Sequence, residues 1–169
     1  DALGGRLRSE RQNLDGKPAM QWVRGAAAAL DALDDVTVMN RTTGFGYYDG
    51  NVIAAVERVA DHLATPPEHA VRQRLWHIRA GRVVIAAGAT ERPLVFTGND
   101  RPGVMLASAT RTYVNRFAVQ PGKTAVVFAN NDDCYQTALD LHRAGIEIQA
   151  VVDSRHDGHG AAKQQAEAA

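Results

Sequence analysis

The stretch "TAVVFANNDDCYQTALDLHRAGIEIQAVVD", Thr124 to Asp153, decides the fold. Residues 124–129 are a short apolar run typical of a buried strand. Residues 132–145 follow the helical period and end on a glycine, which favours an amphipathic helix with a C-terminal cap. Residues 146–153 form a second apolar run. The pattern predicts one βαβ unit whose parallel strands are joined by a right-handed crossover, and therefore an α/β fold.

A βαβ unit invites a dinucleotide-binding interpretation, which depends on the turn between its first strand and its helix. Alignment with the Gly-x-Gly-x-x-Gly motif puts Ala129, Asn131 and Cys134 at the three glycine positions. Glycine there permits a tight turn, close approach of backbone to pyrophosphate, and close helix packing. Asp132 and Asp133 add carboxylates that repel a phosphate at the helix N-terminus. The turn is predicted to cap its own helix.

Asp153 ends the second strand about 20 residues after this turn, the spacing at which dinucleotide sites place an acid on a ribose hydroxyl. The alternative interpretation is a solvated acid at a strand end.

The rest of the chain predicts a β-rich first part. Pro18 and the alanines that follow it favour a helix, and β-branched and aromatic residues then favour strands. The predicted elements are a helix over 18–30, two short strands within 36–51, a strand (or a short helix) over 51–59, two strands within 71–89 that bend at Ala80-Gly81, and a helix over 107–117. We expect three parts: 1–92, the back part of a first dinucleotide-binding lobe with a β-meander; 93–155, a second, degenerate Rossmann-like lobe; and 156–169, a flexible tail.

Two small-residue stretches are candidate ligand sites. Ala87, Gly88 and Ala89 follow an apolar run, where bare backbone would let a ligand lie close; a small-residue crossing between two lobes is the other interpretation. Gly4-Gly5 beside Arg6 presents backbone N–H groups and positive charge suited to a phosphate, although an exposed turn has the same composition.

Composition excludes several classes of function. Hydrophobic residues make up 45% and charged residues 22% of the chain, which is typical of a globular protein. Lys plus Arg and Asp plus Glu number 19 each, so no net charge draws the chain to nucleic acid or to an anionic membrane. The longest apolar runs fall short of the roughly 20 residues that span a bilayer. We expect no nucleic-acid partner and no membrane contact.

Metal, redox and nucleophilic chemistry find little support. Cys134 is the single cysteine; it lacks a redox partner and fits a reducing cytoplasm. His156 and His159 have no further zinc ligands nearby. Glu91 with Arg92 predicts a local ion pair or a hinge contact. We predict no catalytic residue and no metal site.

Three stretches together resemble the α subunit of heterotetrameric sarcosine oxidase: "TTGFGYYDGN" (42–51), "RLWHIRAGRVVIAAGATERPLVFTGNDRPGVMLASATRTYVNRF" (74–117) and "AVVFANNDDCYQTALDLHRAGIEIQAVVD" (125–153). The resemblance runs in register from Leu3 to Arg155. It implies a Rossmann-like FAD/NAD(P)-binding fold of two lobes, with the second inserted in the first. It also implies that a glycine-rich loop lies upstream of Asp1 and that this chain is a central piece of a longer subunit.

The same resemblance implies the site and its cofactors. Its nucleotide-site motifs fall on Gly4, Gly5, Arg6, Thr43, Gly44, Ala87, Gly88 and Ala89. In the family the α subunit holds NAD, while the β subunit carries FAD and shares a covalent FMN at the αβ boundary. We expect NAD in the complete α subunit, FAD and FMN elsewhere in the complex, sister subunits (chiefly β) as partners, and a cytoplasmic location.

The family complex oxidatively demethylates sarcosine to glycine with oxygen and tetrahydrofolate and releases hydrogen peroxide. Because amine oxidation belongs to the β subunit, we expect no turnover by this chain alone. Two alternatives remain: an interaction module that binds no ligand, and the α subunit of a related opine or proline dehydrogenase.

Overall fold

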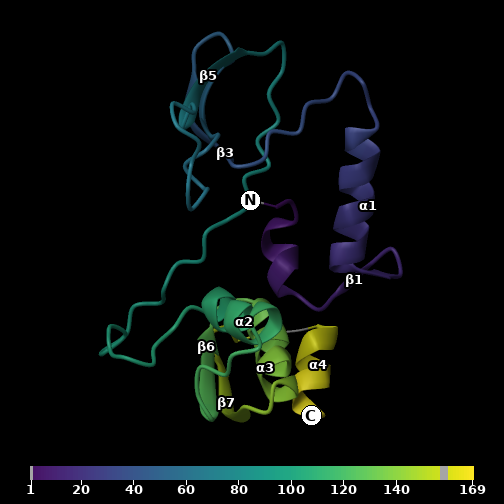
Figure 1. Cartoon of the computed structure of the whole chain (residues 1–169). Coiled ribbons are helices and arrows are strands. Elements are labelled where there is room, and N and C mark those ends of the chain that lie inside the picture. Colours follow the sequence, from purple (N-terminus) through teal and green to yellow (C-terminus); the bar gives the residue numbers. More distant parts are fainter. Residues whose placement is uncertain (1, 157–159) are drawn as a thin grey trace. The chain divides into compact units, whose positions relative to one another are not determined.

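The computed structural model describes residues 2–156 and 160–169 and divides the chain into two compact units (Figure 1). The first contains the residues up to Gly5 together with Val23–Gly88; the second contains Arg6–Trp22 and Ala89–Ala169. The boundary after Gly88 lies close to the one predicted after Arg92, but Arg6–Trp22 groups with the second unit, whereas the sequence places it with the first. The assignment of the two units as dinucleotide-binding lobes stays a prediction.

An antiparallel sheet in the order β3-β4-β5 forms the centre of the first unit (Figure 1). Its strands are β3 (Thr42–Tyr48), β4 (Val52–Arg58) and β5 (Gln73–Arg79). The central β4 pairs with both neighbours and buries Ala54 and Ala55. The predicted β-meander is confirmed, and 51–59 is a strand rather than a helix.

A short hairpin leads into the first long helix. β1 (Asn13–Leu14) and β2 (Lys17–Pro18) are antiparallel and connected by Asp15-Gly16. Both connecting residues have positive φ, 49° and 72°, as a two-residue hairpin turn with the native twist requires. Helix α1 (Ala19–Asp31) starts directly after Pro18, which confirms the predicted helix.

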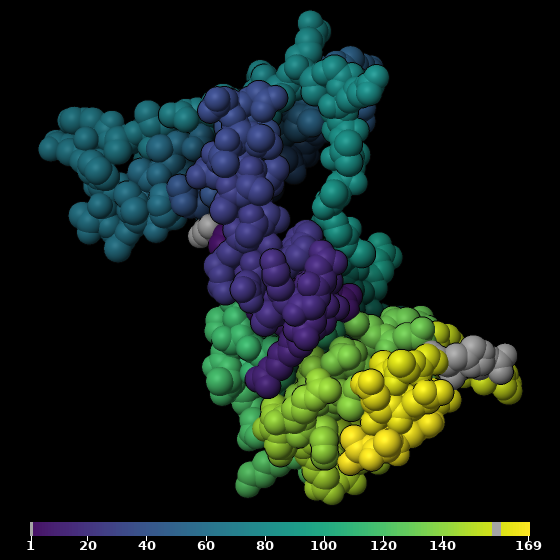
Figure 2. All heavy atoms as spheres, turned by 90° about the vertical axis from the view of Figure 1, so that its right-hand side faces the viewer, coloured from purple at the N-terminus to yellow at the C-terminus, as the bar shows by residue number. Residues whose placement is uncertain are grey.

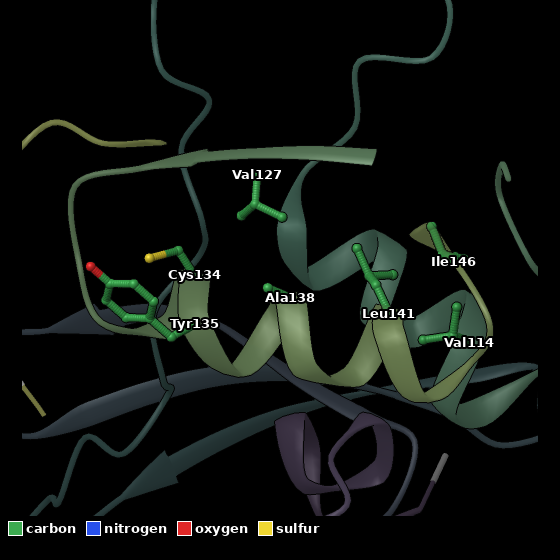
Figure 3. Packing of buried hydrophobic residues seen from close by; sticks show 7 residues of the cluster. All are labelled: Val114, Val127, Cys134, Tyr135, Ala138, Leu141 and Ile146. Carbon is green, nitrogen blue, oxygen red and sulfur yellow. The ribbon is translucent and has the colours of Figure 1, made fainter. Parts of the chain in front are cut away.

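The predicted βαβ unit is the centre of the second unit. β6 (Thr124–Ala129) and β7 (Glu147–Asp153) are parallel, and α3 (Asp133–Arg143) connects them. Helix α2 (Ala107–Arg116) packs against α3. Figure 3 shows the buried cluster between them: Val114 of α2, Val127 of β6, Cys134, Tyr135, Ala138 and Leu141 of α3, and Ile146 before β7. The apolar face of α3 therefore covers one face of the parallel strands, as its helical periodicity predicts.

The end of α3 shows why Gly145 is glycine. The N–H of Gly145 donates to the carbonyl of His142 (2.9 Å), and that of Ile146 donates to the carbonyl of Leu141 (3.1 Å). This pair of bonds is a Schellman cap, which needs left-handed backbone at the residue after the C-cap. Gly145 has φ of +82° and confirms the predicted glycine cap.

A helix stands where the sequence predicts a flexible tail. α4 (Ala161–Glu167) lies against α3, as the yellow segment of Figure 2 shows. Ala162 and Ala166, one helical turn apart, pack on the buried cluster. The prediction of irregular structure is wrong over this helix, because alanine is a strong helix former and a small apolar face suffices to dock it.

Two predicted strands are also wrong. The strand expected at the start of 36–51 is irregular, since the chain turns at Arg41 (φ +53°) before β3 begins. The run 82–89 is irregular as well, although its composition favours a strand. Val84 and Ile85 are 89% and 71% exposed, because a strand needs a neighbouring strand for its backbone groups and 82–89 pairs with none among the described residues.

Candidate functional site

The first unit contains most of the residues predicted to hold a nucleotide. Those that group together there are Gly4, Gly5, Thr43, Gly44, Ala87 and Gly88. Arg6 and Ala89, the residues that follow Gly5 and Gly88, group with the second unit. Gly5 begins a 3-10 helix, η1 (Gly5–Ser9); Thr43 and Gly44 lie on β3; and 87–89 lie in the irregular stretch after β5.

Two glycines of this set, Gly5 and Gly88, have open space beside their backbone. Gly5 has φ of +46° and Gly88 φ of +75°, and a Cβ atom built at either residue would meet nothing within 4 Å. Ala87 and Ala89 are exposed. Open backbone with small flanking residues fits the close approach that a nucleotide phosphate needs.

The β3 part of the set lies beside a bulge. Thr43 is exposed and pairs with Val56, Gly44 pairs with Ala55, and the register shifts between Gly44 and Gly46. A bulge breaks the regular ladder and re-aims the strand locally, a feature that occurs often beside binding sites.

Arg6 is engaged by the chain's own carboxylates. Its guanidinium pairs with Glu10 and with Asp133. Hydrogen bonding to Glu10 raises the pKa of Arg6 above its ordinary value. A guanidinium shared by two carboxylates is a weaker phosphate ligand than a free one, because the carboxylates offset its charge.

A buried ion-pair network lies behind Arg6, and the sequence did not predict it. Arg111 Nε donates to Asp140 Oδ2 at 2.9 Å, and Arg111 also lies 3.2 Å from an oxygen of Asp133. The side chain of Asp140 is 0% exposed and that of Arg111 6%. Charges buried this deeply require partners. The residues that form the network are far apart in the sequence, so no local motif announces it.

The turn of the βαβ unit is closed by the chain's own side chains. Asn131 Oδ1 accepts the N–H of Asp133 at 3.0 Å, which caps α3. The guanidinium of Arg155 bridges Asp132 (2.6 Å) and Asp153 (2.7 Å). The turn thus satisfies one N–H of the helix N-terminus, as a self-capping turn predicts, whereas the N-cap residue Asp132 makes no side-chain cap bond.

Asp153 does not stand as a free acid at the strand end. Tyr135 donates its hydroxyl to Asp153 at 2.9 Å, and Arg155 donates from both backbone and side chain. Hydrogen bonding by Arg155 holds the pKa of Asp153 well below its ordinary range. The ribose-binding interpretation of Asp153 loses its support, because the carboxylate already has these donors.

Other side chains considered in the sequence have ordinary structural roles. Cys134 is buried, and burial raises the pKa of its thiol, which disfavours the reactive thiolate. Glu91 accepts the N–H groups of Ala107 (3.0 Å) and Ser108 (2.7 Å), so it caps α2; the expected ion pair with Arg92 or hinge contact is replaced by this cap. His159, the second residue of the His-x-x-His pair, lies outside the described residues.

Over 2–156 and 160–169, no group of His, Cys, Asp and Glu side chains has the geometry to hold a metal ion. No helix in the same ranges is long and apolar enough to cross a bilayer.

The chain is similar in sequence to several proteins that share one name. The "Sarcosine oxidase subunit alpha" of Rhizobium meliloti (strain 1021) is 50% identical over 152 residues, covering 90% of this chain and 15% of the relative. Those of Corynebacterium sp. strains P-1 and U-96 are 45% and 44% identical, covering 90% and 95% of this chain and 16% and 17% of the relatives. The chain therefore spans 15 to 17% of the length of these relatives. No protein-family model matches the chain.

Among solved structures, L-proline dehydrogenase from P. horikoshii superimposes with a TM-score of 0.63 and 23% sequence identity, covering 91% of this chain and 29% of that one. At this identity the likeness concerns the fold alone. It confirms the predicted α/β, Rossmann-like fold class.

Proposed function

Because the chain is related along nine-tenths of its length to one segment of sarcosine oxidase α subunits, we propose that it is part of the NAD-holding α subunit of a sarcosine oxidase complex. The whole complex oxidatively demethylates sarcosine to glycine, uses oxygen and tetrahydrofolate, and releases hydrogen peroxide. This chain contributes nucleotide binding and architecture, and it does not oxidise the amine.

The observation that carries the proposal is the sequence identity of 44 to 50% over 90 to 95% of the chain. The open backbone at Gly5 and Gly88 supports the NAD part of the proposal, since both residues belong to the implied nucleotide motifs and neither is covered by side chains. Gly4, Thr43, Gly44, Ala87 and Ala89 complete the proposed NAD contacts.

The other components of the complex follow from the same relationship. FAD and FMN are held elsewhere in the complex, with the β subunit as the chief partner in a heterotetramer. A cytoplasmic location belongs to the same proposal and is supported by the buried, unpaired Cys134, which suits a reducing compartment.

A second candidate, an α subunit of a related opine or proline dehydrogenase, is favoured by the structural likeness to L-proline dehydrogenase. The two candidates differ in the amine that the assembled complex oxidises. An interaction role without any ligand is favoured for the second unit alone, where Asn131 bonds to the N–H of Asp133 and Arg155 pairs with Asp132 of the βαβ turn.

The test is a calorimetric titration with NAD of the full-length protein that contains this chain and, separately, of residues 1–169. Saturable binding by the full-length protein and no heat from residues 1–169 are the expected results, because the phosphate loop motif is outside these residues. Saturable binding by residues 1–169 would instead assign a working site to the turn after β6. Absence of binding by the full-length protein would reject the NAD role.

Gly88→Val provides the site-specific test in the full-length protein. The branched side chain would occupy the open space beside the backbone and weaken NAD binding about tenfold or more, equivalent to about 1.4 kcal/mol. Gly103→Val is the matched control: Gly103 also has positive φ (+96°) and open space around it, but it lies outside the nucleotide motifs. Equal effects of both substitutions on NAD affinity would reject the assignment of 87–89.

A further inference from the structure

The stretch Arg6–Gln12 is fastened to helix α2 by residues more than 100 positions later in the chain. Thr112 Oγ1 donates to Ser9 Oγ at 3.0 Å, and Asn115 Nδ2 donates to the Ser9 carbonyl at 2.9 Å. Arg111 lies 3.6 Å from Glu10 Oε1. Figure 2 shows this purple stretch against green residues of the second unit. We call the set Ser9, Glu10, Arg111, Thr112 and Asn115 the Glu10 clamp.

Glu10 is the centre of the clamp. Only 4% of its side chain is exposed, and that of Arg111 is 6% exposed. Glu10 also accepts from Arg6 Nε and Gln12 Nε2. Ion pairs so far from water are weakly screened, and separating this pair removes one partner from each of two buried charges. The clamp therefore holds its segment in one geometry.

The two glycines that precede the clamped segment have no side chains that could fix their own conformation. Gly4 and Gly5 have positive φ, 119° and 46°, and lack side chains that could pack. Successive glycines have more backbone freedom than other residues, so ordering them costs more conformational entropy. Gly5 begins η1 and Ser9 ends it, so the clamp grips the far end of the same short helix.

The carboxylates beside Arg6 make it a poor main ligand for a phosphate at this segment. Its side chain is 66% exposed, and its guanidinium is shared by Glu10 and Asp133. An approaching phosphate would meet both carboxylates as well as the cation. Holding η1 in place is the role that the contacts support better.

We propose that Glu10 is a positioning residue for nucleotide binding: through Arg111 it holds η1 on helix α2 and thereby fixes the Gly4-Gly5 pair. The inference rests on the proposed NAD role of that pair.

The experiment measures the NAD dissociation constant of the full-length protein and its variants by calorimetry. Glu10→Gln removes the charge that pairs with Arg111 while keeping the size of the side chain. Thr112→Val loosens the same segment without any change of charge. Asp153→Asn is the matched control, since it removes an ion-paired carboxylate from the same unit but not from the clamp. All titrations are made at a temperature where circular dichroism shows every variant folded, so that lost stability alone leaves the dissociation constant unchanged.

Wild-type binding is the first requirement, and its absence would reject the proposed function itself. Given wild-type binding, Glu10→Gln and Thr112→Val should each weaken NAD binding. Glu10→Gln should raise the NAD dissociation constant by about tenfold, which lies within the usual effect of a mutation on the coupling between linked sites. Asp153→Asn should leave it unchanged. If Arg6 instead contacts the phosphate directly, Glu10→Gln frees its charge and tightens binding. Unchanged or tighter binding by Glu10→Gln, or no effect of Thr112→Val, overturns the inference.

Discussion

Asp140→Ala is expected to destabilise the second unit more than any exposed substitution in it. Asp140 accepts from Arg111 Nε, Asn115 Nδ2 and Gln136 Nε2, each at 2.9 Å, and its side chain is 0% exposed. Truncation leaves the buried Arg111 with Asp133 (3.2 Å) and Glu10 (3.6 Å) but removes its ion pair with Asp140 (2.9 Å). Removing one member of a buried ion pair costs about 3 to 5 kcal/mol. Against a total of about 5 to 15 kcal/mol for a typical protein, this is a large share of the free energy of unfolding.

Hydrogen exchange of the α3 amides is the appropriate assay, because it reports opening of this unit independently of the first. The protection free energy of Asp133–Arg143 should fall by about 3 kcal/mol or more in Asp140→Ala. The control is Asp132→Ala, because the Asp132 carboxylate is 63% exposed and pairs with Arg155. The protection free energy of the α3 amides should fall by less than about 1 kcal/mol in this variant.

Adding Arg111→Met to Asp140→Ala removes the stranded charge, so the double variant should lose less protection than the sum of the single losses. A loss in Asp140→Ala no larger than in the control, or strictly additive losses, would refute the reasoning that losing Asp140 leaves the buried charge of Arg111 incompletely compensated.

Two further predictions concern local structure and pH. Gly145→Ala should lower the melting temperature by several degrees, since left-handed backbone costs a residue with Cβ roughly 1 to 2 kcal/mol; an unchanged melting temperature would contradict the Schellman cap. Hydrogen bonding by Arg155 lowers the pKa of Asp153 in the folded state below the ordinary aspartate value of about 3.9, which applies to the unfolded state. As pH falls below that value, the unfolded state takes up a proton at Asp153 before the folded state does. The stability from this pair is therefore present above that pH and is lost as pH falls. The urea midpoint should therefore drop more steeply between pH 5 and pH 3 in the wild type than in Asp153→Asn, and equal slopes would count against the pair.

The candidate site was partly predictable. Glycine and alanine at 4–5 and 87–89 indicate bare backbone in any fold, and Gly5 and Gly88 do present it. The charge environment of Arg6 was not predictable, because Asp133 is 127 positions away and only folding brings the two together.

The sequence by itself determined the elements whose signals are local. The period of 132–145, the apolar runs at 124–129 and 146–153, and the glycine at 145 specify a strand, a capped helix and a strand, since side-chain periodicity and turn chemistry act within a few residues. The absence of glycine at the three motif positions after β6 likewise excludes a standard phosphate loop there from the sequence alone.

Only the tertiary structure decided which charges are buried and which runs become strands. The run 82–89 has strand composition but finds no neighbour in the described structure, and α4 forms because Ala162 and Ala166 have a surface to pack on. Glu10 and Arg111 become a buried pair because α2 and the N-terminal stretch meet in space. Strand pairing, helix docking and ion-pair burial depend on distances between residues remote in the chain, and no local pattern encodes those distances.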